Sequence, residues 1–314
     1  IYKEALEKDY FCKRADGPYM KGKVWPGECN FPDYTNPAVR EWWAGLFKEL
    51  ISDIGVKGVW NDMNEPAVME VPNKTFPMDV RHDYDGNPCS HRKAHNIYGT
   101  QMARATYHGV KRFAYPKRPF VITRSAYAGA QRYTSSWTGD NVATWEHLWI
   151  ANIQVQRMSI SGMGFTGSDI GGFAEQPSAE LYARWIQLGV FHPFCRTHSS
   201  GDHGDQEPWS FNEEVVDITR KFVELRYQLL PYLYTMFWEY INDGVPMLKP
   251  LVYFDQEDPQ THYRTDEFIF GNQILVCPIL EPNAIGRRLY LTEGNWYNYW
   301  TDELVAGGKE IYVP

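Results

Sequence analysis

The sequence lacks several features that would place the protein in a specialised class. Its net charge is -8 at pH 7 and no block of basic residues is present, which argues against binding to nucleic acids or anionic membranes. No apolar run approaches the roughly 20 residues that a membrane-spanning helix needs. The five cysteines are scattered without CxxC spacing, so we expect mostly free thiols, and the cellular compartment stays open.

The sequence also lacks an initiator methionine and a signal-like start, since it begins with "IYKEALEKDY". It closes with "GGKEIYVP", inside a strand-like pattern that no turn follows. We therefore expect an internal piece of a longer protein. Its 314 residues are enough for one large domain and part of a second.

Aromatic residues, in contrast, are plentiful, with 12 Trp, 21 Tyr and 16 Phe. Hydrophobic cores use aromatic rings, and so do sugar-binding clefts, where flat rings cover pyranose faces. Composition alone does not choose between these two uses.

Strand-like and helix-like segments alternate along most of the chain. Asn36-Pro37 predicts a helix that begins with an Asn cap and ends near Gly55. Further helices are predicted around 95–112 and from Ser210, with a capping box to Glu213, to about 244. Strands are predicted at 56–62, 119–125, 135–141, 164–172 and 190–198. This alternation predicts βα units and a parallel sheet.

The pattern changes after Gly244. The segments "DEFIFGNQILVCPIL" and "RRLYLTEGNWYNYW" are short strands separated by turn signals, which is typical of an antiparallel β unit. We place a domain boundary near Gly244–Pro250, so that 1–245 forms an α/β domain and 246–314 begins a β domain.

Each predicted parallel strand ends in polar residues instead of further apolar ones. They are Asp62, Arg124, Asp140, Asp169, Arg196 and His198. In a (β/α)8 barrel, the C-terminal ends of the strands converge on the ligand. These residues therefore predict a binding site at one mouth of such a barrel. Five strands do not close an eight-stranded barrel, so we also expect an exposed apolar edge near Val56–Trp60.

The stretch "KGVWNDMNEPAV" carries two carboxylates inside an apolar run. Strand alternation puts Trp60, Asp62 and Asn64 on one face, whereas Glu65 is out of phase and precedes Pro66. We interpret Asp62 as a reacting carboxylate and Glu65 as a supporting hydrogen-bond acceptor. The alternative for Glu65 is a helix cap or a loop salt bridge.

Asp140, in "WTGDN", is the predicted partner of Asp62. Gly139 lets the backbone approach closely, and Trp137 is placed to shield the carboxyl group. Two carboxylates at one barrel mouth suit glycoside hydrolysis, in which one attacks the anomeric carbon and the other protonates the leaving oxygen. We expect a separation nearer the roughly 5–5.5 Å of retaining enzymes than the roughly 6.5–9.5 Å of inverting ones.

Several of these motifs resemble glycoside hydrolase family 31, the α-glucosidase family. "GVWNDMNEP" is similar to the nucleophile signature of the family, and "TRSAYAGAQRYTSSWTGDN" is similar to its acid/base segment. "GSDIGGF" resembles its second signature, and "HPFCRTHS" resembles its last barrel strand. "HRKAHNIYG" is similar to the neutral α-glucosidase and glucosidase II branch.

The resemblance implies an incomplete (β/α)8 TIM barrel, with its first strands missing, followed by the start of an antiparallel β-sandwich. It implies Asp62 as nucleophile and Asp140 as acid/base. Arg124, Asp169 and His198 would bind hydroxyls of the sugar in the first subsite. The residues that would line or brace this pocket are Trp25, Trp60, Met63, Trp137, Phe173 and Arg196. The family's acidic sugar-binding residue near the first barrel strand has no match here.

The motifs therefore predict a retaining, exo-acting α-glucosidase that removes terminal α-linked glucose from oligosaccharides through a glycosyl-aspartate. An α-transglucosylase or an α-glucan lyase would use the same site. A non-catalytic sugar-binding homologue would typically lose Asp62 or Asp140, and both are present. We expect no cofactor, and we expect the missing barrel segment and β-sandwich of the full-length chain as partners. Self-association stays open.

The segment 81–95 contains several potential metal ligands, namely His82, Asp83, Asp85, Cys89, His91 and His95. His91 and His95 lie four residues apart, as zinc ligands on a helix do. "DYDGN" resembles part of a calcium loop but lacks its distal glutamate. Because neither pattern is complete, we predict a solvated loop and helix start without a metal.

Overall fold

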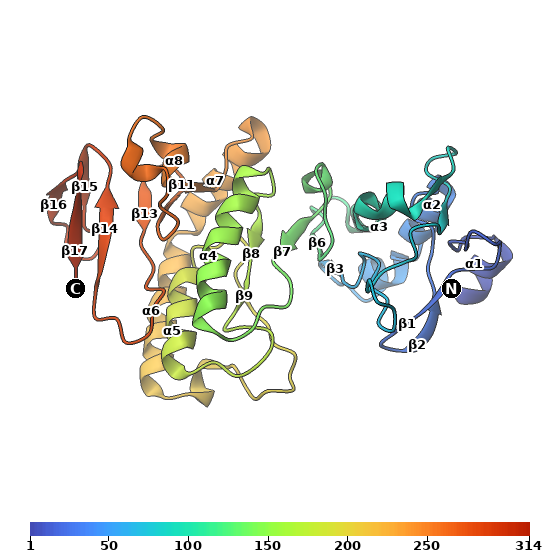
Figure 1. Ribbon diagram of the computed structural model, residues 1–314, viewed down its shortest axis with the longest axis horizontal. Coiled ribbons are helices and arrows are strands. Elements are labelled where there is room, and N and C mark those ends of the chain that lie inside the picture. Colours follow the sequence, from blue (N-terminus) through green and yellow to red (C-terminus); the bar gives the residue numbers. More distant parts are fainter. The chain divides into compact units, whose positions relative to one another are not determined.

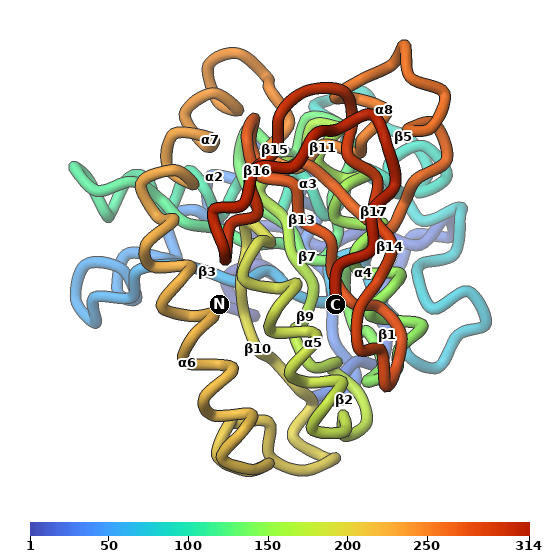
Figure 2. The backbone as a smooth tube through the Cα atoms, turned by 90° about the vertical axis from the view of Figure 1, so that its left-hand side faces the viewer, coloured from blue at the N-terminus to red at the C-terminus, as the bar shows by residue number.

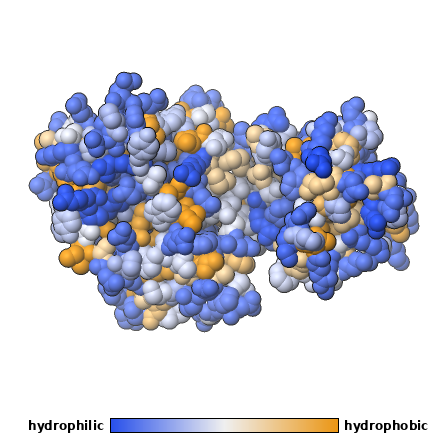
Figure 3. All heavy atoms as spheres, viewed as in Figure 1, coloured by the Kyte–Doolittle hydropathy of each residue, from blue (hydrophilic) through white to orange (hydrophobic).

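The structure, a computed structural model, describes residues 1–314 and divides the chain into two units. We call Ile1–Ser136 the N-terminal unit and Trp137–Pro314 the C-terminal unit. On the face shown in Figure 3, hydrophilic side chains predominate in each unit and hydrophobic side chains form scattered groups. None of the helices combines the length and the apolar character that crossing a membrane requires.

The N-terminal unit alternates short strands with helices. Its helices are α1 (Tyr2–Glu7), α2 (Pro37–Gly45) and α3 (His91–Ala114), with a π-helical turn at Glu49–Asp53 and a 3-10 turn at Ala130–Arg132. Its strands are β1 (Lys21–Val24), β2 (Gly27–Asn30), β3 (Val59–Asn61), β4 (Arg81–His82), β5 (Cys89–Ser90), β6 (Val121–Thr123) and the start of β7 (Ser135–Trp137). β3, β6 and β7 pair in parallel, whereas β1–β2 and β4–β5 are antiparallel hairpins.

Helix α2 begins as the sequence predicts, because Asn36 Oδ1 accepts a hydrogen bond from Ala38 N at 2.8 Å. It ends at Gly45, ten residues before the predicted end at Gly55. The chain changes to π-helical bonding, in which Ile54 N donates to Glu49 O. Helix α3 packs closely on α2, since a Cβ atom on Gly109 would lie 2.5 Å from the carbonyl oxygen of Ala44.

The predicted parallel strands are much shorter in the structure. β3 covers only Val59–Asn61, because the backbone leaves the ladder at Met63, whose φ is 59°. β3 has one strand partner, β6, and Trp60 on it is 42% exposed, as expected for an edge strand. Where the ladder stops, the backbone of the following residues departs from the strand direction.

The C-terminal unit combines α/β and antiparallel parts (Figure 1). Its helices are α4 (Trp145–Ile160), α5 (Ala179–Gly189), α6 (Glu213–Gln228), α7 (Leu230–Asp243) and α8 (Leu251–Phe254), with 3-10 turns at Pro208–Ser210 and Pro259–Thr261. Its first strands are β8 (Thr166–Gly167), β9 (Asp169–Ile170) and β10 (Arg196–Thr197). They are followed by β11 (Leu248–Pro250), β12 (Phe268–Phe270), β13 (Ile274–Val276), β14 (Arg287–Leu291), β15 (Asn295–Tyr297), β16 (Leu304–Ala306) and β17 (Lys309–Val313).

The strands after Gly244 are antiparallel, as the sequence predicts. β11, β12 and β13 form one sheet, and β14 runs beside β17 (Figure 2). β15 and β16 form a further antiparallel pair. The domain boundary near Gly244–Pro250 stays a prediction, because the division into compact units falls elsewhere, between Ser136 and Trp137.

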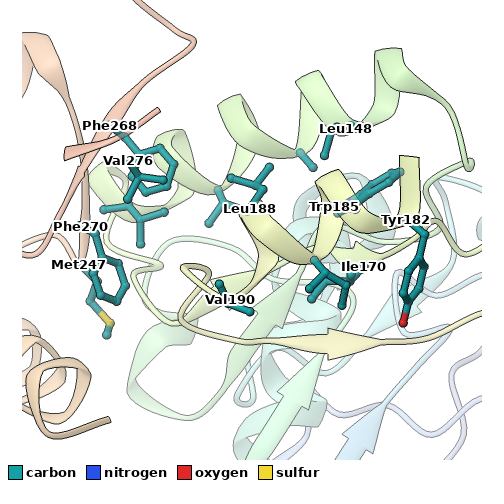
Figure 4. Close-up of a cluster of buried hydrophobic side chains, with 14 of the residues drawn as sticks. Leu148, Ile170, Tyr182, Trp185, Leu188, Val190, Met247, Phe268, Phe270 and Val276 are labelled. Atoms are coloured by element: carbon teal, nitrogen blue, oxygen red, sulfur yellow. The ribbon is translucent and has the colours of Figure 1, made fainter. Parts of the chain in front are cut away.

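One large apolar core holds the C-terminal unit together (Figure 4). Helices α4 and α5 contribute Leu148, Trp185 and Leu188, which are completely buried. Ile170 of β9 and the β12 residues Phe268 and Phe270 pack into the same cluster. The core therefore joins the α/β part to the antiparallel sheet, and it fixes β9, which carries Asp169.

The long final helix predicted from Ser210 is two helices, α6 and α7. Asn212 caps α6 instead of Ser210, because its side chain accepts a hydrogen bond from Val215 N at 2.9 Å. The Ser210 hydroxyl bonds to the carbonyl oxygens of Asp205 and Glu207. Pro231 separates the two helices, since proline lacks an N–H and is tolerated only in a first helical turn.

Candidate active site

In the N-terminal unit, Arg124 joins the carboxylates that follow β3. Its Nε and Nη2 donate to the two oxygens of Glu65 at 2.8 and 3.0 Å. Its Nη1 lies 3.2 Å from Asp62 Oδ1, and Nη2 also donates to Met63 Sδ at 3.0 Å. One planar guanidinium thus holds Glu65 in a fork and orients Asp62 at the end of the strand.

Asn64 fixes the backbone around this cluster. Its Nδ2 donates to Thr123 Oγ1 at 2.8 Å, and its Oδ1 accepts from Ser125 N at 3.1 Å. Asn64 is buried, whereas the Asp62 side chain is 36% exposed. The predicted alternation that placed both on one face is therefore wrong, because the strand ends at Asn61.

The sequence reasoning gave Asn64 no such role. Its signal was a second asparagine inside an apolar run, "WNDMN", at a place where burial requires partners for the amide. The same applies to Asn61, whose Oδ1 accepts from Thr106 Oγ1 at 3.0 Å. Together these amides attach the end of β3 to α3 and β6.

The two remaining candidates of the N-terminal unit are exposed tryptophans. Trp60 belongs to β3, whereas Trp25 lies in the turn between β1 and β2 and is 80% exposed. Their predicted role, lining or bracing the sugar-binding pocket, stays a prediction.

In the C-terminal unit, Asp169 and Arg196 form a buried ion pair. They face each other in the parallel register of β9 and β10, and Arg196 Nη2 donates to Asp169 Oδ1 at 2.6 Å. The Asp169 side chain is 0% exposed. The guanidinium also lies 5.4 Å from the ring centre of Trp137, within the range of a cation–π contact.

Asn141 links this ion pair to the loop after β9. Its Nδ2 donates to the carbonyl oxygen of Asp169 at 3.0 Å, and its Oδ1 accepts from Phe173 N at 2.9 Å. Gly172 allows this contact, because its φ is 92° and a Cβ there would lie 2.6 Å from the Ala143 backbone. The loop thus places Phe173 against His198, with ring centres 5.3 Å apart.

Asp140 is exposed and follows Gly139, whose φ of 86° suits glycine. The neighbouring Asn141 is held by the bonds just described, so the backbone that carries Asp140 is fixed on one side. Asp140 belongs to the C-terminal unit and Asp62 to the N-terminal unit. The separation of their carboxyl groups stays a prediction.

A second arginine supports the turn that leads into β10. Arg226 of α6 donates from Nη1 to the carbonyl oxygens of Val190 and His192, at 2.5 and 2.8 Å, and from Nη2 to that of Pro193 at 2.9 Å. Burial lowers the pKa of Arg226, and burial lowers the pKa of His192 to about 3. Sequence reasoning missed Arg226, because an arginine in an amphipathic helix usually lies on its solvated face.

Polar side chains at the C-terminal ends of parallel strands are typical of the active sites of TIM-barrel enzymes. The family description "Glycosyl hydrolases family 31 TIM-barrel domain" matches residues 1–236, and "Glycosyl hydrolase family 31 C-terminal domain" matches 244–314. The chain belongs to glycosyl hydrolase family 31.

Known proteins match nearly the whole chain. Alpha-glucosidase 2 of Bacillus thermoamyloliquefaciens is 45% identical over 311 residues, which are 98% of this chain and 39% of that protein. The crystal structure of a glucosidase II alpha subunit in a Tris-bound form matches with 36% identity and a TM-score of 0.93, over 99% of this chain and 34% of that one. The chain thus spans about two fifths or less of the length of these relatives.

A third match is a cycloalternan-degrading enzyme of Trueperella pyogenes, whose structure is a complex with a covalent intermediate. It is 27% identical with a TM-score of 0.90, and the match covers 99% of this chain and 42% of that one.

Proposed function

We propose that the full-length protein is a retaining, exo-acting α-glucosidase that releases terminal α-linked glucose from oligosaccharides. The observation that carries this proposal is the contact of Arg124 with both Asp62 and Glu65 at the end of β3. A nucleophile must be held in one orientation toward the anomeric carbon, and the guanidinium supplies that restraint.

In the first step, Asp62 attacks the anomeric carbon while Asp140 gives a proton to the leaving oxygen, so a β-linked glycosyl-aspartate forms. In the second step, Asp140 takes a proton from water, which attacks the same carbon and frees Asp62. Two inversions give net retention. The covalent intermediate in the Trueperella pyogenes enzyme supports this chemistry in a structure with the same fold.

The sugar in the first subsite is held by Arg124, Asp169 and His198. Asp169 is buried and pairs with Arg196, so a sugar hydroxyl that bonds to this carboxylate meets a charge held in a fixed position. A site built this way discriminates strongly against an analogue that lacks the hydroxyl, because the buried group is then unpaired. We assign Trp25, Trp60, Met63, Trp137, Phe173 and Arg196 to the lining of this pocket.

The test uses the full-length protein with p-nitrophenyl α-glucoside and maltotriose. NMR of the first turnovers should show α-glucose, and maltotriose should yield glucose and maltose. Initial β-glucose would contradict retention, and internal cleavage of longer chains would contradict exo action. Predominant transfer of glucose to maltose would identify a transglucosylase, and an unsaturated anhydro-sugar would identify a lyase.

The matched control is Glu65→Gln, which keeps the size of the side chain that Arg124 holds. It should retain the covalent step at a reduced rate, whereas Asp62→Asn should lose it. Equal loss in both variants would contradict the assignment of Asp62 as nucleophile.

A further inference from the structure

The segment predicted to be a solvated loop holds a buried chain of polar side chains. His82 and His91 are 2% and 0% exposed. His82 Nε2 lies 2.9 Å from His91 Nδ1, and His91 Nε2 lies 2.9 Å from His95 Nδ1. The prediction holds for the loop at 85–88, which is exposed, and for the helix start at His91, but it is wrong for His82 and His91, because β4 and the first turn of α3 pack against an apolar cluster that contains Phe76 and Tyr98.

The inner end of this chain meets two more potential metal ligands. His82 Nδ1 lies 3.1 Å from Asp33 Oδ1 and 3.8 Å from Cys12 Sγ. One ligand atom of each residue lies within 4.8 Å of the others, and all three residues are buried. They come from three separate segments, so their convergence does not follow from sequence spacing.

We propose that Cys12, Asp33 and His82 bind a zinc-type divalent metal ion. In a tetrahedral zinc site with bonds of about 2.0–2.3 Å, neighbouring ligand atoms lie roughly 3.3–3.8 Å apart. The measured nitrogen–oxygen and nitrogen–sulfur distances of 3.1 and 3.8 Å are close to that range. The proposal is independent of the glucosidase function, because these residues take no part in the catalytic assignment.

Charge supports a divalent ion at this place. A thiolate from Cys12 and the carboxylate of Asp33 carry two negative charges, and neutral His82 adds none, so a divalent cation makes the buried cluster neutral. The thiol proton leaves to solvent as the sulfur–metal bond forms.

The surrounding hydrogen bonds match those of a metal site. A histidine that binds metal through Nδ1 donates its Nε2–H to a further acceptor, and here His91 Nδ1 is in place to accept it. Asp33 Oδ2 accepts from Asp83 N at 2.7 Å, and Oδ1 accepts from the Thr35 hydroxyl at 2.7 Å, which orients the carboxylate.

The test measures metal in the full-length protein. The protein is stripped with a chelator, loaded with Zn²⁺, freed of excess metal and analysed by mass spectrometry for bound zinc. We expect Cys12→Ser to weaken zinc binding by at least about tenfold. The matched control is Cys29→Ser, which changes a partly buried cysteine on β2 outside the cluster and should bind like the parent.

A second readout uses the parent protein, so it does not depend on any variant folding correctly. Co²⁺ loaded into the parent should give a thiolate-to-cobalt charge-transfer absorption. In a separate measurement, His91→Ala should weaken binding about 10–100-fold while keeping that band. The proposal is overturned if the parent takes up no zinc, if Cys12→Ser binds zinc as tightly as the parent, or if cobalt binds without a thiolate band.

Discussion

The two units hold their charged candidate residues in opposite ways. In the N-terminal unit, Arg124 contacts two carboxylates, and the side chains of Asp62 and Glu65 are 36% and 34% exposed. In the C-terminal unit, Arg196 pairs with Asp169, whose side chain is 0% exposed. Water therefore still solvates the first cluster, whereas the second depends on its ion pair. On this comparison we expect changes in the first cluster to affect activity more than stability, and changes in the second to affect both.

The largest expected effect is a loss of activity when a proposed catalytic carboxylate is removed. Asp62→Ala should lower kcat/KM on every α-glucoside by about 10⁴-fold or more, because no covalent intermediate forms. Asp140→Ala should stay active on α-glucosyl fluoride, whose leaving group needs little acid assistance. Stopped assays with maltose and with α-glucosyl fluoride measure the activity of both variants. Similar rates for the two variants on the fluoride would show that the roles are wrongly assigned.

The next effect concerns stability. Arg196→Met should destabilise the full-length protein by about 3–5 kcal/mol, because it leaves the Asp169 carboxylate buried without its partner. Arg124→Met should cost about 1 kcal/mol or less, since its carboxylates are partly solvated. Urea unfolding followed by fluorescence compares the two. Adding Asp169→Asn to Arg196→Met should recover part of the loss, and a double variant no more stable than the single one would contradict this reasoning.

A smaller effect tests the two asparagines that hold the site backbones. Asn64→Ala and Asn141→Ala should each destabilise the protein by roughly 1–3 kcal/mol, because each strands buried hydrogen-bond partners. Asn64→Ala should also lower kcat more than it raises KM, since it loosens the backbone that carries Asp62. Thermal unfolding and steady-state kinetics are the measurements. An unchanged kcat in Asn64→Ala would show that the backbone of β3 keeps its place without this amide.

The smallest expected effect is a pH dependence. Burial keeps His192 neutral in the folded state, with its pKa lowered from 6.5 to about 3. Its contribution to stability is therefore present above pH 6.5 and is lost as the pH falls, by about 1 kcal/mol for each pH unit. The free energy of unfolding of the parent and of His192→Gln, measured from pH 7 to 5, tests this. As the pH falls, the free energy of unfolding of the parent should decrease more than that of His192→Gln. Parallel pH curves for the two proteins would contradict this prediction.

Much of the framework followed from local patterns. The Asn36 cap and the antiparallel strands after Gly244 agree with the structure, because caps and turns depend largely on neighbouring residues, and the five cysteines are free, as their scattered spacing indicates. The family motifs also predicted the TIM-barrel and C-terminal domains that the family comparisons show.

Other features depend on contacts that no local pattern contains. The burial of Asn64 depends on Thr123, 59 positions away, and the proposed metal site needs Cys12, Asp33 and His82 to meet. The alternation rule failed at Met63, where a left-handed φ ends the strand. The helix predicted from Ser210 failed because Asn212 competes as a cap and Pro231 interrupts the helical bonding.

Arg226 has a consequence for how this chain can vary among related sequences. Its three acceptors at the turn before β10 are backbone carbonyls, so the side chains of Val190, His192 and Pro193 are not what it recognises. Homologues can therefore change the turn residues one at a time and keep the contact. They cannot exchange the arginine for lysine as easily, because a single ammonium group does not span three carbonyls in one plane. The side chain on which this contact depends therefore lies on α6, outside the catalytic motifs.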